Sequence, residues 1–195
     1  MSKWRLLAVI LAAGLLADQA SKFLAVDRLT TALDRPGAGL AARIQAFYKV
    51  RHVEGWATDP YVVYAPLWRM RYAENPGAAW GLFRGASERT RTLFFGAATL
   101  AAVTFILLYL RKLSAEQRLL QVALSLVLTG ALGNFIDRLA RGYVVDFIDW
   151  YWWNRPDLYW PTFNVADSMI VVGVGLLLLF PGPRAGARPV AARRE

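Results

Sequence analysis

Four stretches of the chain are almost continuously apolar, and more polar segments separate them. They cover residues of about 4–26, 93–110, 117–136 and 165–181. Each comes close to the roughly 20 residues that an α-helix needs to cross the hydrocarbon core of a membrane. The pattern predicts a membrane all-α fold with four transmembrane helices.

The first stretch has a second interpretation, because Lys3 and Arg5 precede an apolar run as they would in a cleavable signal peptide. Apolar character resumes at residues 23–26, however, and three further stretches still have to cross the membrane. We therefore expect one membrane-embedded domain over residues 1–183, followed by a flexible, basic cytoplasmic tail over 184–195.

The loop over residues 27–92 has the pattern of a small β element. Within residues 67–72, apolar and basic residues alternate from Trp68 to Tyr72, as in a half-buried strand. Residues 75–77 signal a turn, and residues 79–83 fit a second strand. Residues 38–53 fit either a short helix or a strand. We expect a small antiparallel cradle on the outer membrane surface.

The tryptophans gather in the polar segments. Seven of the eight, all but Trp4, lie in the loop over 27–92 or in the segment over 137–164. Tryptophan rings favour the headgroup level of a membrane, so the aromatic-rich stretch over 150–160 is predicted to be an interfacial segment. An aromatic cage for a substrate is the alternative.

The basic residues predict the orientation of the chain. They are Lys3 and Arg5 before the first stretch, Arg111, Lys112 and Arg118 between the second and third, and Arg184, Arg188, Arg193 and Arg194 in the tail. Because basic residues beside spans favour the cytoplasm, both termini are expected there and the two longer loops face outward. This topology explains much of the net charge of +9. No basic helix suited to nucleic acid is present, so membrane lipid is the expected partner and nucleic acid is not.

Several ionisable residues lie at the ends of the apolar stretches, where the cost of burying charge makes each a functional candidate. Asp18 and Lys22 are four positions apart on the first predicted helix and can form an ion pair. Such a pair can be structural, or it can bind the backbone of a substrate. Asp137 is expected to be a hydrogen-bond or charge partner, and the neighbouring Arg138 has five donors that can hold a peptide carbonyl.

Asp146 and Asp167 have surroundings suited to catalysis. Asp146 has apolar neighbours and no adjacent cation, and Asp149 close to it is expected at the membrane interface. Asp167 follows Asn164 by three positions, where Asn164 can cap a helix and an acid in the first turn is favoured. A plain helix cap is the alternative for Asp167. The chain between the two aspartates leaves the third span and returns to the fourth, so the carboxylates can meet.

Other catalytic classes lack the residues they need. The chain has no cysteine, and His52 is its only histidine, which disfavours thiol catalysis, a Ser-His-Asp triad and a zinc site. Two carboxylates that share a site hold one proton between them, so one can accept a proton from water while the other donates to the scissile group. We expect hydrolysis by this pair with no metal or cofactor. Because a helix start favours the charged form of Asp167, Asp146 is expected to hold the shared proton.

Five short motifs surround these residues. They are Asp18–Lys22 (D-Q-x-[TS]-K), Asn75–Gly81 (N-x-G-A-A-[FW]-[GS]), Gly133–Arg138 (G-N-x-x-D-R), Gly142–Phe147 (G-x-V-x-D-[FY]) and Phe163–Ser168 (F-N-x-A-D-[SA]). Together they resemble the motifs of lipoprotein signal peptidase, or signal peptidase II, a family of bacterial aspartic membrane peptidases. The resemblance covers most of the chain, from the first span to the fourth.

The resemblance implies that Asp146 and Asp167 are the catalytic dyad. It implies roles in substrate binding or dyad positioning for Asn75, Gly77, Asn134, Arg138 and Asn164, and supporting roles for Asp18, Lys22 and Asp137. The implied substrates are diacylglyceryl-modified prolipoproteins, cut just before the lipidated cysteine. The implied location is the bacterial inner membrane, with a multi-pass monomer whose active site lies near the periplasmic face.

One departure from the family pattern concerns the outer loop. Asp18 and Asn75 are separated by more residues than in the family, with the excess between about 30 and 68. This leaves open the shape of the clamp around the peptide, the substrate preference and the inhibitor sensitivity. Two other functions also stay open: a proton- or ion-coupled carrier, whose acids would be spread across the membrane, and a non-catalytic relative that binds lipoproteins without cutting them.

Overall fold

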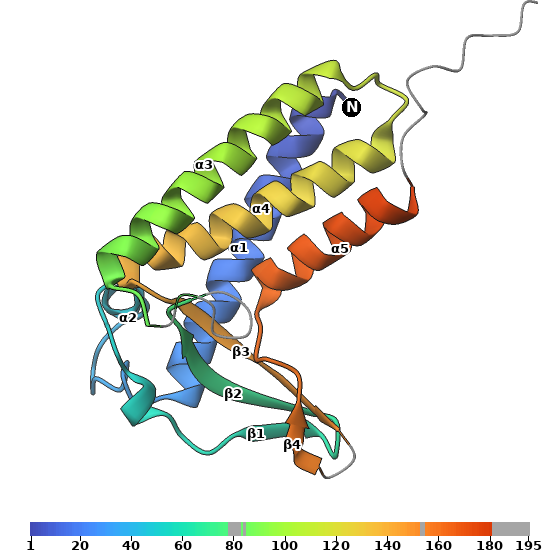
Figure 1. Ribbon diagram of the computed structural model, residues 1–195. Helices are drawn as coiled ribbons and strands as arrows, with labels where there is room; N and C mark the ends of the chain where they lie inside the picture. The colour runs from blue at the N-terminus through green and yellow to red at the C-terminus, as the bar shows by residue number, and fades with distance from the viewer. Residues whose placement is uncertain (78–82, 84, 153–154, 181–195) are drawn as a thin grey trace, which may run out of the picture.

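The computed structural model describes residues 1–77, 83, 85–152 and 155–180. Its main part is a bundle of four helices that run side by side (Figure 1). They are α1 (Lys3–Leu29), α3 (Glu88–Lys112), α4 (Arg118–Arg141) and α5 (Val165–Leu179). A small antiparallel sheet lies at one end of the bundle, and the N-terminus lies at the other. The fold is that of a mostly helical membrane protein.

Three of the predicted spans are confirmed as helices of sufficient length. Within the described residues, α1, α3 and α4 are long and apolar enough to cross a membrane. The fourth predicted span corresponds to α5, which is apolar but only 15 residues long. The predicted tail over 184–195 lies outside the described residues.

The helix ends follow local sequence signals. The Ser2 hydroxyl accepts a hydrogen bond from the Arg5 backbone N–H at the start of α1, and Ser87 does the same for Thr90 at the start of α3. Gly142 ends α4 with a φ of 81°, a left-handed conformation that glycine adopts without strain. This end lies beyond the predicted boundary at residue 136. Asp137 and Arg138 lie in the last turns of α4, at the end of the third predicted span.

The sheet joins two segments that are distant in the sequence. Its strands are β1 (Tyr61–Tyr64), β2 (Trp68–Asn75), β3 (Val144–Trp152) and β4 (Arg155–Tyr159), and they are neighbours in that order with antiparallel pairing. The predicted strand over 67–72 is confirmed for residues 68–72, which belong to β2, whereas residue 67 lies in the preceding turn. In the β2–β3 register, Ala73 lies opposite Asp146 and Asn75 lies opposite Val144.

The structure gives the partners of β2 and the conformation of the segment before it. The predicted second strand over 79–83 falls mainly on residues outside the described part of the chain, and Phe83 lies in a turn. The partners of β2 are β1 and β3, because the segment after α4 returns as a strand along it. The ambiguous residues 38–53 contain a helix, α2 (Leu40–Phe47), and a short 3-10 helix, η1 (Glu54–Trp56), follows.

The buried apolar residues form two clusters. One packs the C-terminal end of α1 and α2 against the sheet and includes Val26, Phe47 and Val145. The other lies between α1, α3 and α4 and includes Leu7 and Ile106. Along α1, the two clusters are separated by a segment that carries buried polar side chains.

Candidate active site

Asp146 and Asp167 reach one site from different elements. Asp146 lies on β3 and is 2% exposed, and Asp167 lies in the first turn of α5 and is half-buried. The return of the chain from β3 to α5 brings them together: Phe163 forms a bridge with Ile148 just before α5 begins. The segments that carry Asp146 and Asp167 are therefore neighbours, as predicted.

Asn164 connects the two carboxyl groups. Its Nδ2 donates to Asp146 Oδ1 at 2.7 Å, and its backbone N–H donates to Asp167 Oδ2 at 3.2 Å. Its Oδ1 in turn accepts from the Asp167 backbone N–H at 2.9 Å, which completes a capping box at the start of α5. The helix cap and the contact with Asp146 therefore come from the same side chain, so capping does not exclude a role at the site.

Asn134 makes a second connection from α4. Its Nδ2 donates to Asp167 Oδ1 at 2.7 Å, and its Oδ1 accepts from Asn164 Nδ2 at 3.2 Å. A continuous path of hydrogen bonds thus runs from Asp146 through Asn164 and Asn134 to Asp167. Two neutral amides hold the carboxyl groups in place without adding charge to the site.

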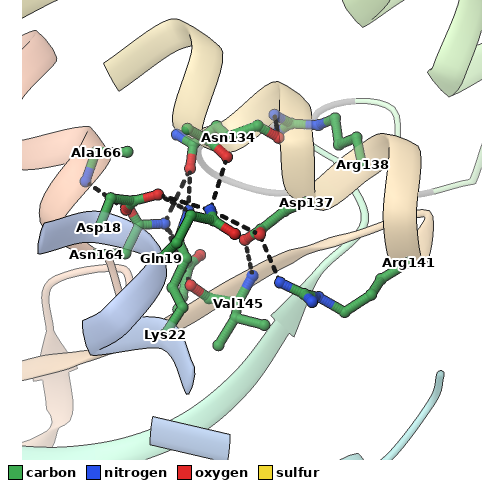
Figure 2. Close-up of polar contacts among 12 residues, drawn as sticks. Asp18, Gln19, Lys22, Asn134, Asp137, Arg138, Arg141, Val145, Asn164 and Ala166 are labelled. Carbon is green, nitrogen blue, oxygen red and sulfur yellow. Dashed lines mark hydrogen bonds and ion pairs between the residues drawn. The ribbon is translucent and has the colours of Figure 1, made fainter. Parts of the chain in front are cut away.

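Beneath these amides lies a buried ionic network formed by four side chains. They are Asp18 and Lys22 of α1 and Asp137 and Arg141 of α4, and each is at most 1% exposed. Figure 2 shows them converging from the two helices towards Asn134 and the start of α5. With two acids and two bases the network has no net formal charge, which lowers the cost of burying it.

Lys22 is the centre of this network. Its Nζ lies 2.9 Å from Asp18 Oδ2, 3.0 Å from Asp137 Oδ2 and 3.0 Å from Asn134 Oδ1. An ammonium group has three N–H donors, so each has an acceptor. The predicted ion pair between Asp18 and Lys22 is present, and it is one part of a larger set of contacts.

The two acids extend the network to the elements that carry the dyad. Asp18 Oδ1 accepts from the backbone N–H of Ala166 at 3.0 Å, within the first turn of α5. Asp137 Oδ2 accepts from the backbone N–H of Val145 at 3.1 Å, next to Asp146 in β3. Asp137 is therefore a hydrogen-bond and charge partner, as predicted.

The close fit of the helices depends on glycines. A Cβ atom at Gly133 would lie 2.6 Å from Asp18 Oδ2, and one at Gly130 would lie 2.3 Å from the carbonyl oxygen of Ala166. Small residues at these crossings allow helix backbones to approach closely. They let α1 and α5 pack closely against α4 beside the site.

Asn75, Gly77 and Arg138 border the dyad on the other side. Asn75 Nδ2 donates to Asp146 Oδ2 at 3.0 Å, and its Oδ1 accepts from the Gly77 backbone N–H at 3.1 Å. Arg138 Nη2 donates to the Gly77 carbonyl at 2.7 Å, and its guanidinium lies over the ring of Phe95 with a 4.1 Å separation from the centroid. Arg138 holds a carbonyl as its donor geometry predicts, although that carbonyl belongs to this chain.

The carboxyl group of Asp146 has a raised pKa. Burial in the protein, and then the nearby Asp167 charge, raise the pKa of Asp146 to about 8. Hydrogen bonds from Asn75 and Asn164 act in the opposite direction but do not cancel these effects. An acid with this pKa carries a proton at neutral pH and can donate it.

Asp149 is buried within the sheet and is 0% exposed. Arg69 Nε and Arg71 Nε donate to its Oδ2 at 2.6 and 3.1 Å, because β2 places the two arginines beside it. Asp149 is thus an ion-pair partner within the sheet.

All the site residues predicted from the sequence lie in one connected set of hydrogen bonds. The contributors that were not predicted include the side chains of Gln19 and Arg141 and the backbone N–H groups of Val145 and Ala166. The spacing of four positions between Asp137 and Arg141 was a usable signal for Arg141. Within the described residues, no group of three or more His, Cys, Asp or Glu side chains is arranged to hold a metal ion.

Comparisons with known proteins give a consistent result. A family model described as signal peptidase (SPase) II matches residues 10–181. A lipoprotein signal peptidase of Anaeromyxobacter sp. (strain Fw109-5) is 60% identical over 195 residues, which are 100% of this chain and 92% of that protein. One from Geobacter metallireducens is 38% identical over 176 residues, 90% of each chain.

Solved structures agree with the sequence comparisons. Two structures described as a bacterial membrane enzyme, obtained by the in meso method at 2.3 and 1.9 Å resolution, superpose with a TM-score of 0.64 and 27% sequence identity. The match covers 89% of this chain in both cases, and 85% and 90% of the respective solved chains.

Proposed function

The chain belongs to the signal peptidase II family, the aspartic-type peptidases that remove the signal peptide from prolipoproteins, and we propose on this basis that Asp146 and Asp167 are its catalytic dyad. The observation that carries the proposal is the hydrogen-bond path that joins the two carboxyl groups through Asn164 and Asn134. This path belongs to a site in which one acid is protonated near neutral pH.

The reaction begins with the dyad holding one proton, on Asp146. Ionised Asp167 takes a proton from a water molecule, whose oxygen forms a bond to the carbonyl carbon of the scissile peptide. Asp146 gives its proton to the carbonyl oxygen, so the intermediate is a neutral diol. The capped start of α5 favours the negative charge that Asp167 carries before the attack.

The second step restores the dyad. Asp167 donates its proton to the amide nitrogen while the carbon–nitrogen bond breaks and its electron pair moves to nitrogen. A hydroxyl proton of the diol returns to Asp146. The products are the signal peptide with a free carboxyl group and a mature chain with a free amino group, and the dyad again holds a single proton.

The residues around the dyad have distinct tasks in this scheme. Asn75, Asn134 and Asn164 orient the two carboxyl groups through the contacts described above. Arg138 is poised between the dyad and the Gly77 carbonyl, and its remaining donors can hold the substrate backbone. Asp18, Lys22 and Asp137 hold in place the segments that carry the dyad, through their contacts with Ala166, Asn134 and Val145.

The chemistry suits a diacylglyceryl-modified prolipoprotein cut before its lipidated cysteine. Such a substrate presents its acyl chains to the membrane and its scissile bond at the surface. The dyad lies where α4 and α5 meet the sheet, at the end of the bundle opposite the N-terminus (Figure 1). We place this end at the periplasmic face of the inner membrane, with α5 as a short fourth span.

An ion-coupled carrier is the rival from another functional class. It would need buried acids spread along the bundle. In the described part of the chain, the fully buried acids are Asp18, Asp137, Asp146 and Asp149, and they belong to the network, the dyad or the sheet. This clustering favours the peptidase.

The direct test uses purified protein in detergent with a diacylglyceryl-modified precursor. Wild type is expected to release the signal peptide, whereas Asp146→Asn and Asp167→Asn are expected to lose cleavage by at least about 10³-fold, as removal of an acid–base group does. Asp149→Asn is the matched control, because it removes a buried acid three positions away on the same strand. Cleavage by either dyad variant at the wild-type rate would overturn the assignment.

A further inference from the structure

The extended outer loop reaches the buried ionic network through α2. The end of this helix is buried: Phe47 is 1% exposed and packs edge-on against Phe23 of α1, with ring centroids 5.7 Å apart. The backbone of the segment after η1 also contacts α1, where the Thr58 N–H donates to the Leu29 carbonyl at 2.9 Å. The segment over 30–59 is thus anchored against α1 and does not form a separate surface loop.

Arg141 is the residue of the network that α2 contacts. Its Nη2 donates to Asp137 Oδ1 at 2.6 Å, and its Nη1 donates to the Phe47 carbonyl at 3.0 Å. The guanidinium also lies over the Phe47 ring, 4.0 Å from the centroid, and 5.5 Å from that of Tyr48. A guanidinium can combine directed hydrogen bonds with stacking on an aromatic ring, which a lysine ammonium cannot.

A short series of hydrogen bonds connects Arg141 to both Asp146 and Asp167. Asp137, which it holds, accepts from the Val145 N–H directly before Asp146. Asp137 also binds Lys22, and Lys22 binds Asn134, which donates to Asp167. Displacement of the Asp137 carboxylate would therefore reach both catalytic acids by separate routes.

The positive charge of Arg141 also balances one of the two buried negative charges of the network. Without it, two buried acids would face the single cation Lys22. The titratable and charged groups that interact with Arg141 or Asp137 are Asp18 and Lys22 on α1, Tyr48 after α2, Arg138 on α4 and Tyr143 before β3, and Arg138 in turn interacts with Asp146 and Asp167. An uncompensated negative charge among them makes each nearby acid harder to ionise.

We propose that Arg141 is a positioning residue for Asp146 and Asp167, and that the outer segment holds it in place through the carbonyl and ring of Phe47. The long outer loop is then part of the catalytic apparatus. This inference rests on the proposed function of the dyad. It gives α2 the role of holding Arg141, and α2 lies outside the five sequence motifs that surround the dyad.

The test compares Arg141→Gln, Arg141→Lys and Phe47→Leu in detergent with the diacylglyceryl-modified precursor. Arg141→Gln is expected to lower kcat by about tenfold or more, because small displacements of reacting groups are costly, while KM changes little. Its pH profile of kcat/KM moves to higher pH.

Arg141→Lys keeps the charge, so its pH profile of kcat/KM stays at the wild-type position, while its kcat lies between those of the wild type and Arg141→Gln. Phe47→Leu keeps the carbonyl and loses the ring, and its fall in kcat is smaller than that of Arg141→Gln.

Arg51→Gln is the matched control. Arg51 also leads from the outer segment to α4, where its Nη2 donates to the Ala140 carbonyl at 3.4 Å, but it is exposed and contacts none of the network residues. It is expected to keep the wild-type kcat and pH profile. All rates are referred to the folded fraction, measured by thermal unfolding, so a variant that folds poorly remains informative.

Two results would overturn the proposal. One is a folded Arg141→Gln enzyme with the wild-type kcat and pH profile. The other is equal loss in Arg141→Gln and Arg141→Lys with an unchanged pH profile, which would indicate a packing role alone. Asp146→Asn and Asp167→Asn, assayed in parallel, separate the two hypotheses. If they are inactive while Arg141→Gln is unaffected, only the positioning role fails, and if they cleave normally, the dyad assignment fails.

Discussion

Lys22 of α1 and Asn134 of α4 are joined by a hydrogen bond of 3.0 Å, and this contact decides which way the Asn134 amide faces. Lysine can only donate, so the oxygen of the amide must point towards Lys22. The NH₂ group of Asn134 is then directed to Asp167, which it reaches at 2.7 Å. A buried cation that does not touch the dyad thereby sets the orientation of a group that does.

Replacing Lys22 with methionine is expected to cause a large loss of stability. The side chains are similar in length, but Lys22→Met leaves Asp18 and Asp137 as buried acids with their shared cation removed. Removing one partner of a buried ion pair typically costs about 3–5 kcal/mol of the free energy of unfolding. The folded remainder is expected to cleave poorly, because Asn134 loses its orienting contact. Thermal unfolding and cleavage in detergent measure both effects.

Lys49→Met is the control for this change, since Lys49 is an exposed lysine just beyond α2. Surface substitutions of this kind usually change stability by no more than about 0.5 kcal/mol. If Lys22→Met unfolds at the same temperature as Lys49→Met and remains active, the network does not have the structural role described here.

The glycine at the crossing of α1 and α4 gives a second prediction. A Cβ atom at Gly133 would lie 2.6 Å from Asp18 Oδ2 and 3.3 Å from Ala166 Cβ. Gly133→Ala is therefore expected to lower the free energy of unfolding by about 1–3 kcal/mol, as overpacking does, and to displace the start of α5 with a loss of activity. Gly175→Ala, in α5, has no atom within 4 Å of its added Cβ and is expected to be neutral or slightly stabilising. Equal unfolding temperatures for the two variants would contradict the close fit.

The parts of the fold that the sequence predicted depend on local signals. The apolar stretches correspond to α1, α3, α4 and α5, because the length and continuity of apolar residues are visible in a single segment. The Asn164–Asp167 cap and the Asp18–Lys22 pair follow from spacings of three and four positions. The motif residues likewise lie together in one site.

The parts that could not be predicted depend on contacts between distant segments. The choice of β3 as a partner of β2 joins residues about 70 to 80 positions apart, and their alternating pattern is compatible with several partners. The burial of Asp149 follows from that pairing. The contact between Arg141 and Phe47 uses a backbone carbonyl, which every residue has, so no side-chain pattern marks it.

The orientation of the chain can be tested by cysteine labelling. The chain has no cysteine, so a single introduced thiol reports its own position. Asp59 lies in the outer segment and Ala115 in the connection between α3 and α4, and both are exposed. In spheroplasts, a membrane-impermeant maleimide is expected to label Asp59→Cys at once and Ala115→Cys only after the membrane is opened. The reverse pattern would place the dyad on the cytoplasmic side.

The raised pKa of Asp146 predicts how stability depends on pH. In the unfolded chain an aspartate has a pKa of about 3.9, whereas in the folded protein that of Asp146 is about 8. Between these values the folded state binds more protons, so this group makes the protein less stable as pH rises from about 4 to 8. Asp146→Asn, which cannot ionise, is expected to show a smaller fall in unfolding temperature between pH 5 and 8 than the wild type.

Asp149→Asn provides the contrast. This substitution removes the carboxylate that pairs with Arg69 and Arg71. Because the two ion pairs are lost, the variant is expected to have a lower unfolding temperature at neutral pH than the wild type. The decline between pH 5 and 8 that is due to Asp146 should persist in this variant. If Asp146→Asn and wild type lose stability in parallel over this range, Asp146 is already ionised at the lower pH.

The same protonation predicts the pH dependence of cleavage. The scheme requires Asp146 to donate a proton, and kcat/KM reports the ionisation of the free enzyme. Activity is therefore expected to fall as the pH rises through about 8, where Asp146 loses its proton. Because interacting carboxyl groups titrate as a pair, direct titration by infrared difference spectroscopy is needed to show which of them holds the proton. A proton found mainly on Asp167 would reverse the roles of the two acids, and a rate that is constant up to pH 9.5 would exclude a required acid in this range.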